Sequence, residues 1–181
     1  MPKHDYSKRS YIVVPYDPKW PKAFEIIRDA IAPVFGSIAE RIEHVGSTSV
    51  PGMAGKPYID ALVIVKDISA VDALNPKMAD LGYRALGEYV APGGRLFAFE
   101  ENGERLVNIH CFLSDHPKTR RFLSLREYLR THPEESKAYA ELKLDLFRRY
   151  PNDYGAYRKE KDAYMNGLDE RAGKWWSTQE P

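Results

Sequence analysis

The residues of this sequence that could do chemistry gather between Gly46 and Asp60. Gly46 has no side chain, so its backbone can approach a phosphate in conformations that other residues resist. Donor residues follow it closely, and they are Ser47, Thr48, Ser49 and Lys56. Hydroxyl and ammonium groups suit an anion, and a short helix beginning here would add backbone N–H groups. The pattern predicts a phosphate-binding loop that faces a carboxylate.

The carboxylate Asp60 stands near the start of an apolar, β-branched run at 58–65 that predicts a buried strand. A charge at the edge of such a strand needs a partner, and Mg²⁺ is one candidate. The ordinary alternative for the hydroxyl residues is turn and capping chemistry, because Ser and Thr often bond to nearby backbone groups. The residues alone leave both interpretations open.

Several elements must position this loop. Apolar residues at helical spacing predict a helix over 21–35, and a strand over 38–45 should lead into the loop. A second helix is predicted over 69–81, where Pro76 should kink or interrupt it. Further strands are predicted over 83–90, 95–100 and 106–112, with Asn102-Gly103 as a hairpin turn. The result is a mixed sheet with helices on it, an α/β (α+β) fold.

From residue 118 the chain changes to charged, aromatic-rich helical segments. Breaks at Pro133 and Pro151 predict three helices, over 119–131, 133–149 and 153–175. In the middle helix Tyr139, Leu142, Leu146 and Tyr150 are spaced to pack on the sheet, with Lys143 nearer the margin. We expect a core over 1–117 and a C-terminal helical region over 118–181 packed on it, counted as two domains or as one.

Composition limits the possible partners. Lys and Arg total 27 against 26 Asp and Glu, and this balance gives no general attraction to nucleic acid or to an anionic membrane. The one cysteine, Cys111, cannot form an internal disulfide and fits a reducing compartment. The residues Met1 to Asp5 contain no apolar signal core, and no run is long enough to span a bilayer. These features predict a cytoplasmic protein, and they leave its oligomeric state open.

Several ordered motifs continue along the chain beyond the loop. They are Val14 to Trp20, Gly94 to Phe97, Asn108 to His110, Arg121 to Leu123, Arg126 to Arg130, Tyr139 with Lys143, and Tyr157 with Lys161. Together with His44 to Gly52, Lys56-Pro57 and Ile59-Asp60, they resemble the GrpB family, whose members resemble the nucleotidyltransferase superfamily. The similarity runs over nearly the whole chain.

This resemblance implies a nucleotidyltransferase-like sheet core followed by helices, and transfer of a nucleotidyl group from a nucleoside triphosphate to an unknown acceptor. It implies catalytic roles for Asp60 and Lys56, and a divalent metal, Mg²⁺ or Mn²⁺, on Asp60 and His110. The residues that it implies for nucleotide or phosphate binding are Gly46, Ser47, Thr48, Ser49, Arg95, Arg126, Lys143 and Lys161.

The carboxylates depart from the superfamily pattern. Tyr58 and Leu62 occupy the positions beside Asp60 where a second carboxylate could stand, and the later strand carries Asn108 and His110. Three interpretations stay open: one metal ion on Asp60 and His110, metal-poor phosphoryl transfer that relies on basic residues, or a non-catalytic nucleotide- or phosphate-binding module. In each, the expected partner is a nucleotide or another phosphorylated small molecule.

The two histidines near the loop have a simpler alternative. His44 and His110 can both be hydrogen-bonded core residues instead of metal ligands. Cys111 follows His110 on a predicted strand, so the two side chains should point to opposite faces, with Cys111 in the core.

Overall fold

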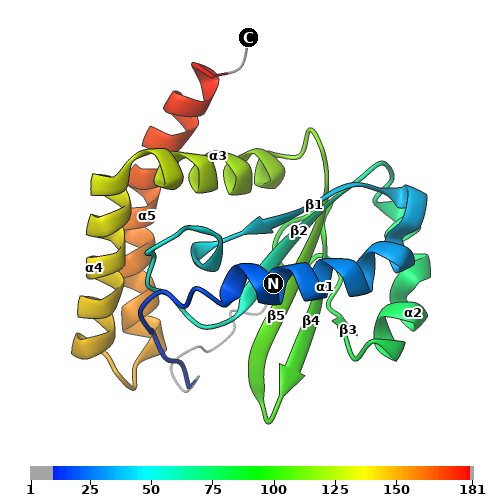
Figure 1. Ribbon diagram of the computed structural model, residues 1–181, viewed down its shortest axis with the longest axis horizontal. Coiled ribbons are helices and arrows are strands. Elements are labelled where there is room, and N and C mark those ends of the chain that lie inside the picture. The colour runs from blue at the N-terminus through cyan, green and yellow to red at the C-terminus, as the bar shows by residue number, and fades with distance from the viewer. Residues whose placement is uncertain (1–9, 180–181) are drawn as a thin grey trace.

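The computed structural model describes residues 10–179 of the 181-residue chain. The predicted absence of a signal core at 1–5 concerns residues outside this part. The centre of the molecule is a five-stranded sheet in the order β1-β2-β5-β4-β3 (Figure 1). Its strands are β1 (Ala39–Val45), β2 (Ile59–Val65), β3 (Arg84–Ala85), β4 (Arg95–Glu101) and β5 (Glu104–Leu113). Only the β2–β5 pair is parallel among these strands, so the predicted mixed sheet is confirmed.

Helices cover the two faces of the sheet. One face packs on α1 (Trp20–Phe35), α2 (Asn75–Asp80) and the short 3₁₀ helix Ser69–Leu74, around side chains such as Val63 and Cys111. The other face carries Leu62, Ile64 and Phe112, which pack with Leu123 of α3 (Pro117–Thr131). Since side chains alternate along a strand, Asp60 shares the α3 face with Leu62. Cys111 is fully buried on the opposite face, as predicted.

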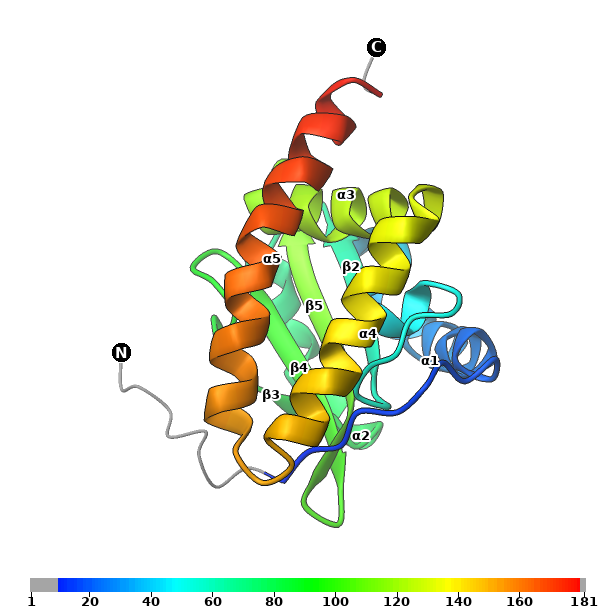
Figure 2. The same ribbon diagram turned by 90° about the vertical axis from the view of Figure 1, so that its left-hand side faces the viewer.

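The two C-terminal helices form a second apolar core. Helices α4 (Pro133–Arg149) and α5 (Tyr154–Ser177) lie side by side in front of the sheet in Figure 2. Their buried residues, including Leu146 and Tyr157, pack with Tyr11, Val50 and Met53 from the N-terminal part of the chain. None of the helices in the described part combines the length and apolar composition that crossing a bilayer requires.

Two predicted elements differ in the structure. The strand expected over 83–90 shortens to Arg84–Ala85. Leu86 and Gly87 still exchange backbone hydrogen bonds with Leu96 of β4, and Gly87, with a φ of +58°, leaves the extended conformation. The helix expected over 69–81 divides into the 3₁₀ helix and α2, with Pro76 in the first turn of α2. Proline has no N–H to continue the preceding hydrogen bonds, so the predicted interruption is confirmed.

The prediction for α4 was wrong in two respects. Tyr139 and Leu146 pack in the second apolar core with α5 and the 50–54 segment instead of on the sheet. Lys143, expected at a margin, is only 2% exposed. Helical spacing shows which residues share a side, but not which neighbouring element covers that side.

Candidate phosphate-binding site

The loop after β1 lies directly on Asp60. Gly46 has a φ of +74°, and a Cβ added there would approach Asp60 Oδ2 to 2.7 Å. A side chain at this position would therefore be strained by its backbone conformation and would also collide with the carboxylate. Glycine is what allows the loop and the carboxylate to meet.

Asp60 is held by side chains from β5. Asn108 lies opposite it in the parallel register, and Asn108 Nδ2 donates to Asp60 Oδ1 over 2.9 Å. His110 Nε2 is 3.1 Å from the same oxygen. Arg105 donates to Asn108 Oδ1 over 2.8 Å, which orients the amide so that its NH₂ group faces Asp60.

His110 completes this network from a buried position. Its Nδ1 is buried without a hydrogen-bond partner, and its ring packs 4.8 Å from the ring of Phe122 on α3. These contacts are those expected of a hydrogen-bonded core histidine. A role for His110 as a metal ligand stays a prediction.

The donor set does not fit the two-metal centre of the superfamily. Among the described residues Asp60 is the single carboxylate bonded to Asn108 and His110, and the Asn108 amide turns its donor side toward it. Among residues 10–179 no group of three or more His, Cys, Asp or Glu side chains is placed to hold a metal ion. Two-metal sites need several anionic oxygens to offset the charge of two cations. A single ion on Asp60 and His110 stays a prediction.

A buried lysine lies on the other side of the glycine-serine loop. Lys143 Nζ, from α4, donates to Ser47 Oγ over 2.8 Å and lies 4.4 Å from the centre of the Tyr139 ring. Within the described residues no carboxylate comes within 4.0 Å of this ammonium. Burial, assisted by the charges of Lys161 and Lys56, holds the pKa of Lys143 well below its usual range. A buried cation held by a hydroxyl and an aromatic ring is short of negative charge.

Two further lysines complete what we call the lysine cluster: Lys56 and Lys161, whose charges act on Lys143. Lys56 Nζ, from the segment before β2, donates to Tyr154 Oη over 2.7 Å. Lys161 Nζ, from α5, donates to Asp162 Oδ1 over 2.7 Å. Both lower the pKa of Lys143, so their charges act on the same space. Lysines from the segment before β2, from α4 and from α5 are therefore close enough to influence one another, and Lys143 brings the group to Ser47.

The other two hydroxyls of the loop have structural contacts. Thr48 Oγ1 lies 2.9 Å from His44 Nε2 and is buried beneath α1. Ser49 Oγ donates to the Gly46 carbonyl over 2.6 Å, inside the turn itself. Of the three predicted donors, only Ser47 directs its hydroxyl to a lysine of the cluster.

The two predicted arginines lie outside the lysine cluster. Arg95 shares the opposite sheet face with Cys111 and makes a two-point ion pair with Asp72, at 2.7 and 2.8 Å. Arg126 donates to Glu43 and to the His44 carbonyl, which ties α3 to β1. A role for either arginine in binding a ligand stays a prediction.

Arg130 and Tyr154 were not among the predicted site residues. Arg130 Nη2 and Nε both donate to the Ser49 carbonyl, at 2.7 and 3.1 Å, and so brace the loop from α3. The helical spacing from Arg126 to Arg130 was a usable signal. Tyr154 approaches Lys56 from α5, and nothing near it in the sequence indicates that contact.

The burial of the His44 side chain predicts that acid will destabilise the fold. It stacks on Phe24 with ring centres 4.7 Å apart, and burial lowers its pKa to about 4, although Asp60 opposes that shift. The unfolded residue titrates near 6.5, so between these values the unfolded chain binds a proton that the folded chain excludes. The free energy of unfolding should therefore fall as the pH drops from about 6.5 to about 4, by up to roughly 3 kcal/mol.

Urea unfolding across this pH range measures the effect. In His44→Phe, which keeps a ring against Phe24 and cannot titrate, this part of the pH dependence should be absent. An identical pH dependence in the variant and the natural protein would assign the effect to other groups.

Several comparisons with known proteins point to the same family. A family profile described as GrpB protein matches residues 10–171. The chain is 36% identical over 172 residues to UPF0157 protein YqkA of Bacillus subtilis, covering 95% of this chain and 50% of that one. It is 29% identical to the Glutamate-rich protein GrpB of Alkalihalophilus pseudofirmus, covering 90% and 95%. The crystal structure of conserved protein GrpB from Enterococcus faecalis matches with a TM-score of 0.86 at 34% identity, over 91% and 99% of the two chains. The chain thus spans half the length of the Bacillus subtilis relative YqkA.

Proposed function

The chain belongs to the GrpB family, and from this premise we propose that it binds the phosphates of a nucleotide, or of another phosphorylated small molecule, at the lysine cluster. The observation that carries the proposal is Lys143, which is buried against Ser47 with no carboxylate beside it in the described part of the chain.

The lysine cluster suits a phosphate chain better than a protein carboxylate. Burying an ammonium group is costly unless an anion accompanies it, and Lys143 lies within the electrostatic reach of two more ammonium groups. Asp162 offsets one of those charges. A ligand with several negative oxygens could accept bonds from Ser47 and the lysines together, as lysine binds phosphate in other phosphate sites.

Nucleotidyl transfer is the second candidate, supported by the position of Asp60. Its carboxylate lies beneath Gly46 and so next to Ser47 along the loop. There it could accept the proton of an acceptor hydroxyl, while the lysines stabilise charge that develops on the phosphates. With one carboxylate in place of two or three, the site supports binding more strongly than transfer. Placement in the nucleotidyltransferase superfamily stays a prediction.

Lys161→Gln is expected to weaken triphosphate binding about tenfold, because it removes one charged donor, a contribution of roughly 1.5 kcal/mol. Isothermal titration with tripolyphosphate and with each nucleoside triphosphate, in Mg²⁺ and in EDTA, measures the affinities. Lys159→Gln, an exposed lysine on the same helix, is the matched control and should bind normally. Equal affinities in all three proteins would reject the lysine cluster as the site.

The same titrations separate binding from transfer. Pyrophosphate released from a bound triphosphate, with loss of release in Asp60→Asn, would establish transfer. Tight binding without release would establish the phosphate-binding module.

A further inference from the structure

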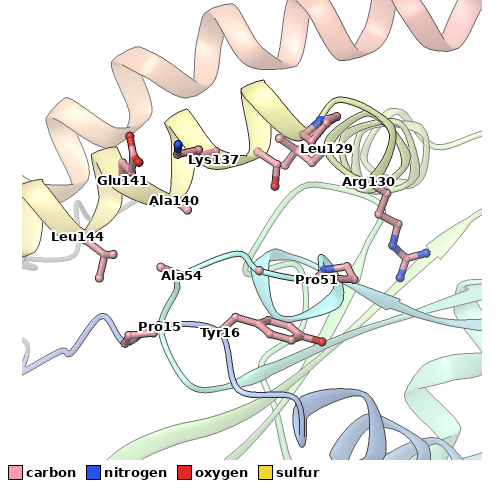
Figure 3. A pocket seen from close by; sticks show the side chains of 13 residues that line it. Pro15, Tyr16, Pro51, Ala54, Leu129, Arg130, Lys137, Ala140, Glu141 and Leu144 are labelled. Atoms are coloured by element: carbon pink, nitrogen blue, oxygen red, sulfur yellow. The ribbon is translucent and has the colours of Figure 1, made fainter.

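A groove lies on α4 next to the lysine cluster and is separate from it. It has a volume of about 660 Å³ and runs between α4, the end of α3, the 51–54 segment and Pro15-Tyr16 (Figure 3). Ala54, which lines it, is followed by Gly55, and a Cβ on Gly55 would come within 2.8 Å of Ser47 Cβ. The 51–55 segment is therefore a wall shared by the groove and the phosphate loop.

The groove has a polar end and an apolar body. Figure 3 shows the guanidinium of Arg130 and the hydroxyl of Tyr16 at one end, with Leu144 at the other. Between them lie small or apolar residues, including Pro51, Ala54 and Ala140. The charged residues in the lining are Arg130, Lys137 and Glu141, so the lining carries one net positive charge.

Arg130 is placed to hold an anion there. Two of its N–H groups bond to the Ser49 carbonyl, and a third approaches Glu127 over 3.4 Å. A guanidinium has five N–H donors, so others remain. Its side chain is 37% exposed, and Glu127 bonds more closely to Arg126, over 2.6 Å. Burial and the charge of Arg126 lower the pKa of Arg130, although Glu127 and Glu43 oppose that shift.

We propose that this groove is a binding site for a small organic carboxylate with an elongated apolar body. The carboxylate lies between Arg130 and Tyr16, and the apolar body runs along Ala54 and Ala140 toward Leu144. Lys137 adds a second positive charge to the lining of the groove. A cavity of this size, mostly apolar with a few polar groups at one end, is typical of small-molecule sites. This ligand is distinct from the phosphate compound, and its site does not depend on the lysine cluster.

The test compares 4-phenylbutyrate with its neutral counterpart 4-phenylbutan-1-ol by isothermal titration and by ligand-observed NMR. The natural protein should bind the acid at least tenfold more tightly than the alcohol. Lys137→Glu should weaken binding of the acid about tenfold and leave the alcohol unchanged. Arg148→Glu makes the same charge change on α4 outside the groove lining, and it should bind like the natural protein.

A filling variant locates the ligand. Ala140→Phe places a ring in the groove and should reduce binding of the acid at least tenfold, whereas Lys143→Met, in the lysine cluster, should leave it within twofold. Equal affinities for acid and alcohol, no binding of either, or full binding by Ala140→Phe would each overturn the proposal. If Ala140→Phe does not fold, Lys137→Glu decides, because Lys137 is exposed and its exchange leaves the apolar cores intact.

Discussion

Lys143→Met is expected to raise the stability of the fold and, at the same time, to lower phosphate affinity by roughly a hundredfold. The side chain is buried, and its ammonium is stabilised by Ser47 Oγ and the Tyr139 ring without a carboxylate among the described residues. Methionine has a similar length and no charge to desolvate, so we expect a gain of about 1–2 kcal/mol. Loss of a charged, buried donor to a phosphate is worth about 3 kcal/mol, hence the predicted fall in affinity.

The pH dependence of stability identifies the cause. Burial holds the pKa of Lys143 below its ordinary value of 10.5. Between the lowered pKa and 10.5 the unfolded chain binds a proton that the folded chain has lost, so the free energy of unfolding rises with pH across this interval. Lys143→Met should lack that rise. Urea unfolding from neutral to alkaline pH measures it.

Lys137→Met on the same helix is the matched control. It is exposed, so it should change neither stability nor phosphate affinity appreciably. A large loss of stability in Lys143→Met with phosphate binding intact would make Lys143 a purely structural residue and would remove the main support for the lysine cluster as a phosphate site.

Gly46→Ala is expected to destabilise the protein by about 3 kcal/mol and to weaken phosphate binding with it. Two penalties act together: a non-glycine residue at a φ of +74°, and a Cβ that would lie 2.7 Å from Asp60 Oδ2. Relief of the collision would move the loop off Asp60 and displace Ser47 from Lys143. Equilibrium unfolding in urea and titration with tripolyphosphate report the two effects.

Gly52→Ala separates the two penalties. Gly52 has a φ of +78°, and a Cβ there would meet nothing within 4 Å. It should therefore lose only the conformational part, about 1 kcal/mol. Equal losses in Gly46→Ala and Gly52→Ala would show that the carboxylate moves aside freely, and that the contact between the loop and Asp60 is not fixed.

Most helices and strands, and the mixed character of the sheet, were predictable from the sequence alone. The helix predicted over 21–35 is Trp20–Phe35, and the strand predicted over 106–112 lies within Glu104–Leu113. Periodicity, proline and glycine act within a few residues of themselves, so they are readable from the chain alone. The family followed from the order of motifs and is confirmed by the comparisons.

Which polar residues lie together could not be predicted from the sequence, because it depends on how distant elements pack. Lys143 appeared marginal by helical spacing, yet the packing of α4 on α5 and the 50–54 segment buries it beside Ser47. Arg95 appeared to belong with the phosphate residues, yet strand register places it on the opposite face, paired with Asp72. The physical reason is the same for both residues. Local spacing fixes which way a side chain points from its own element, whereas its burial and its partners depend on elements that arrive from far along the chain.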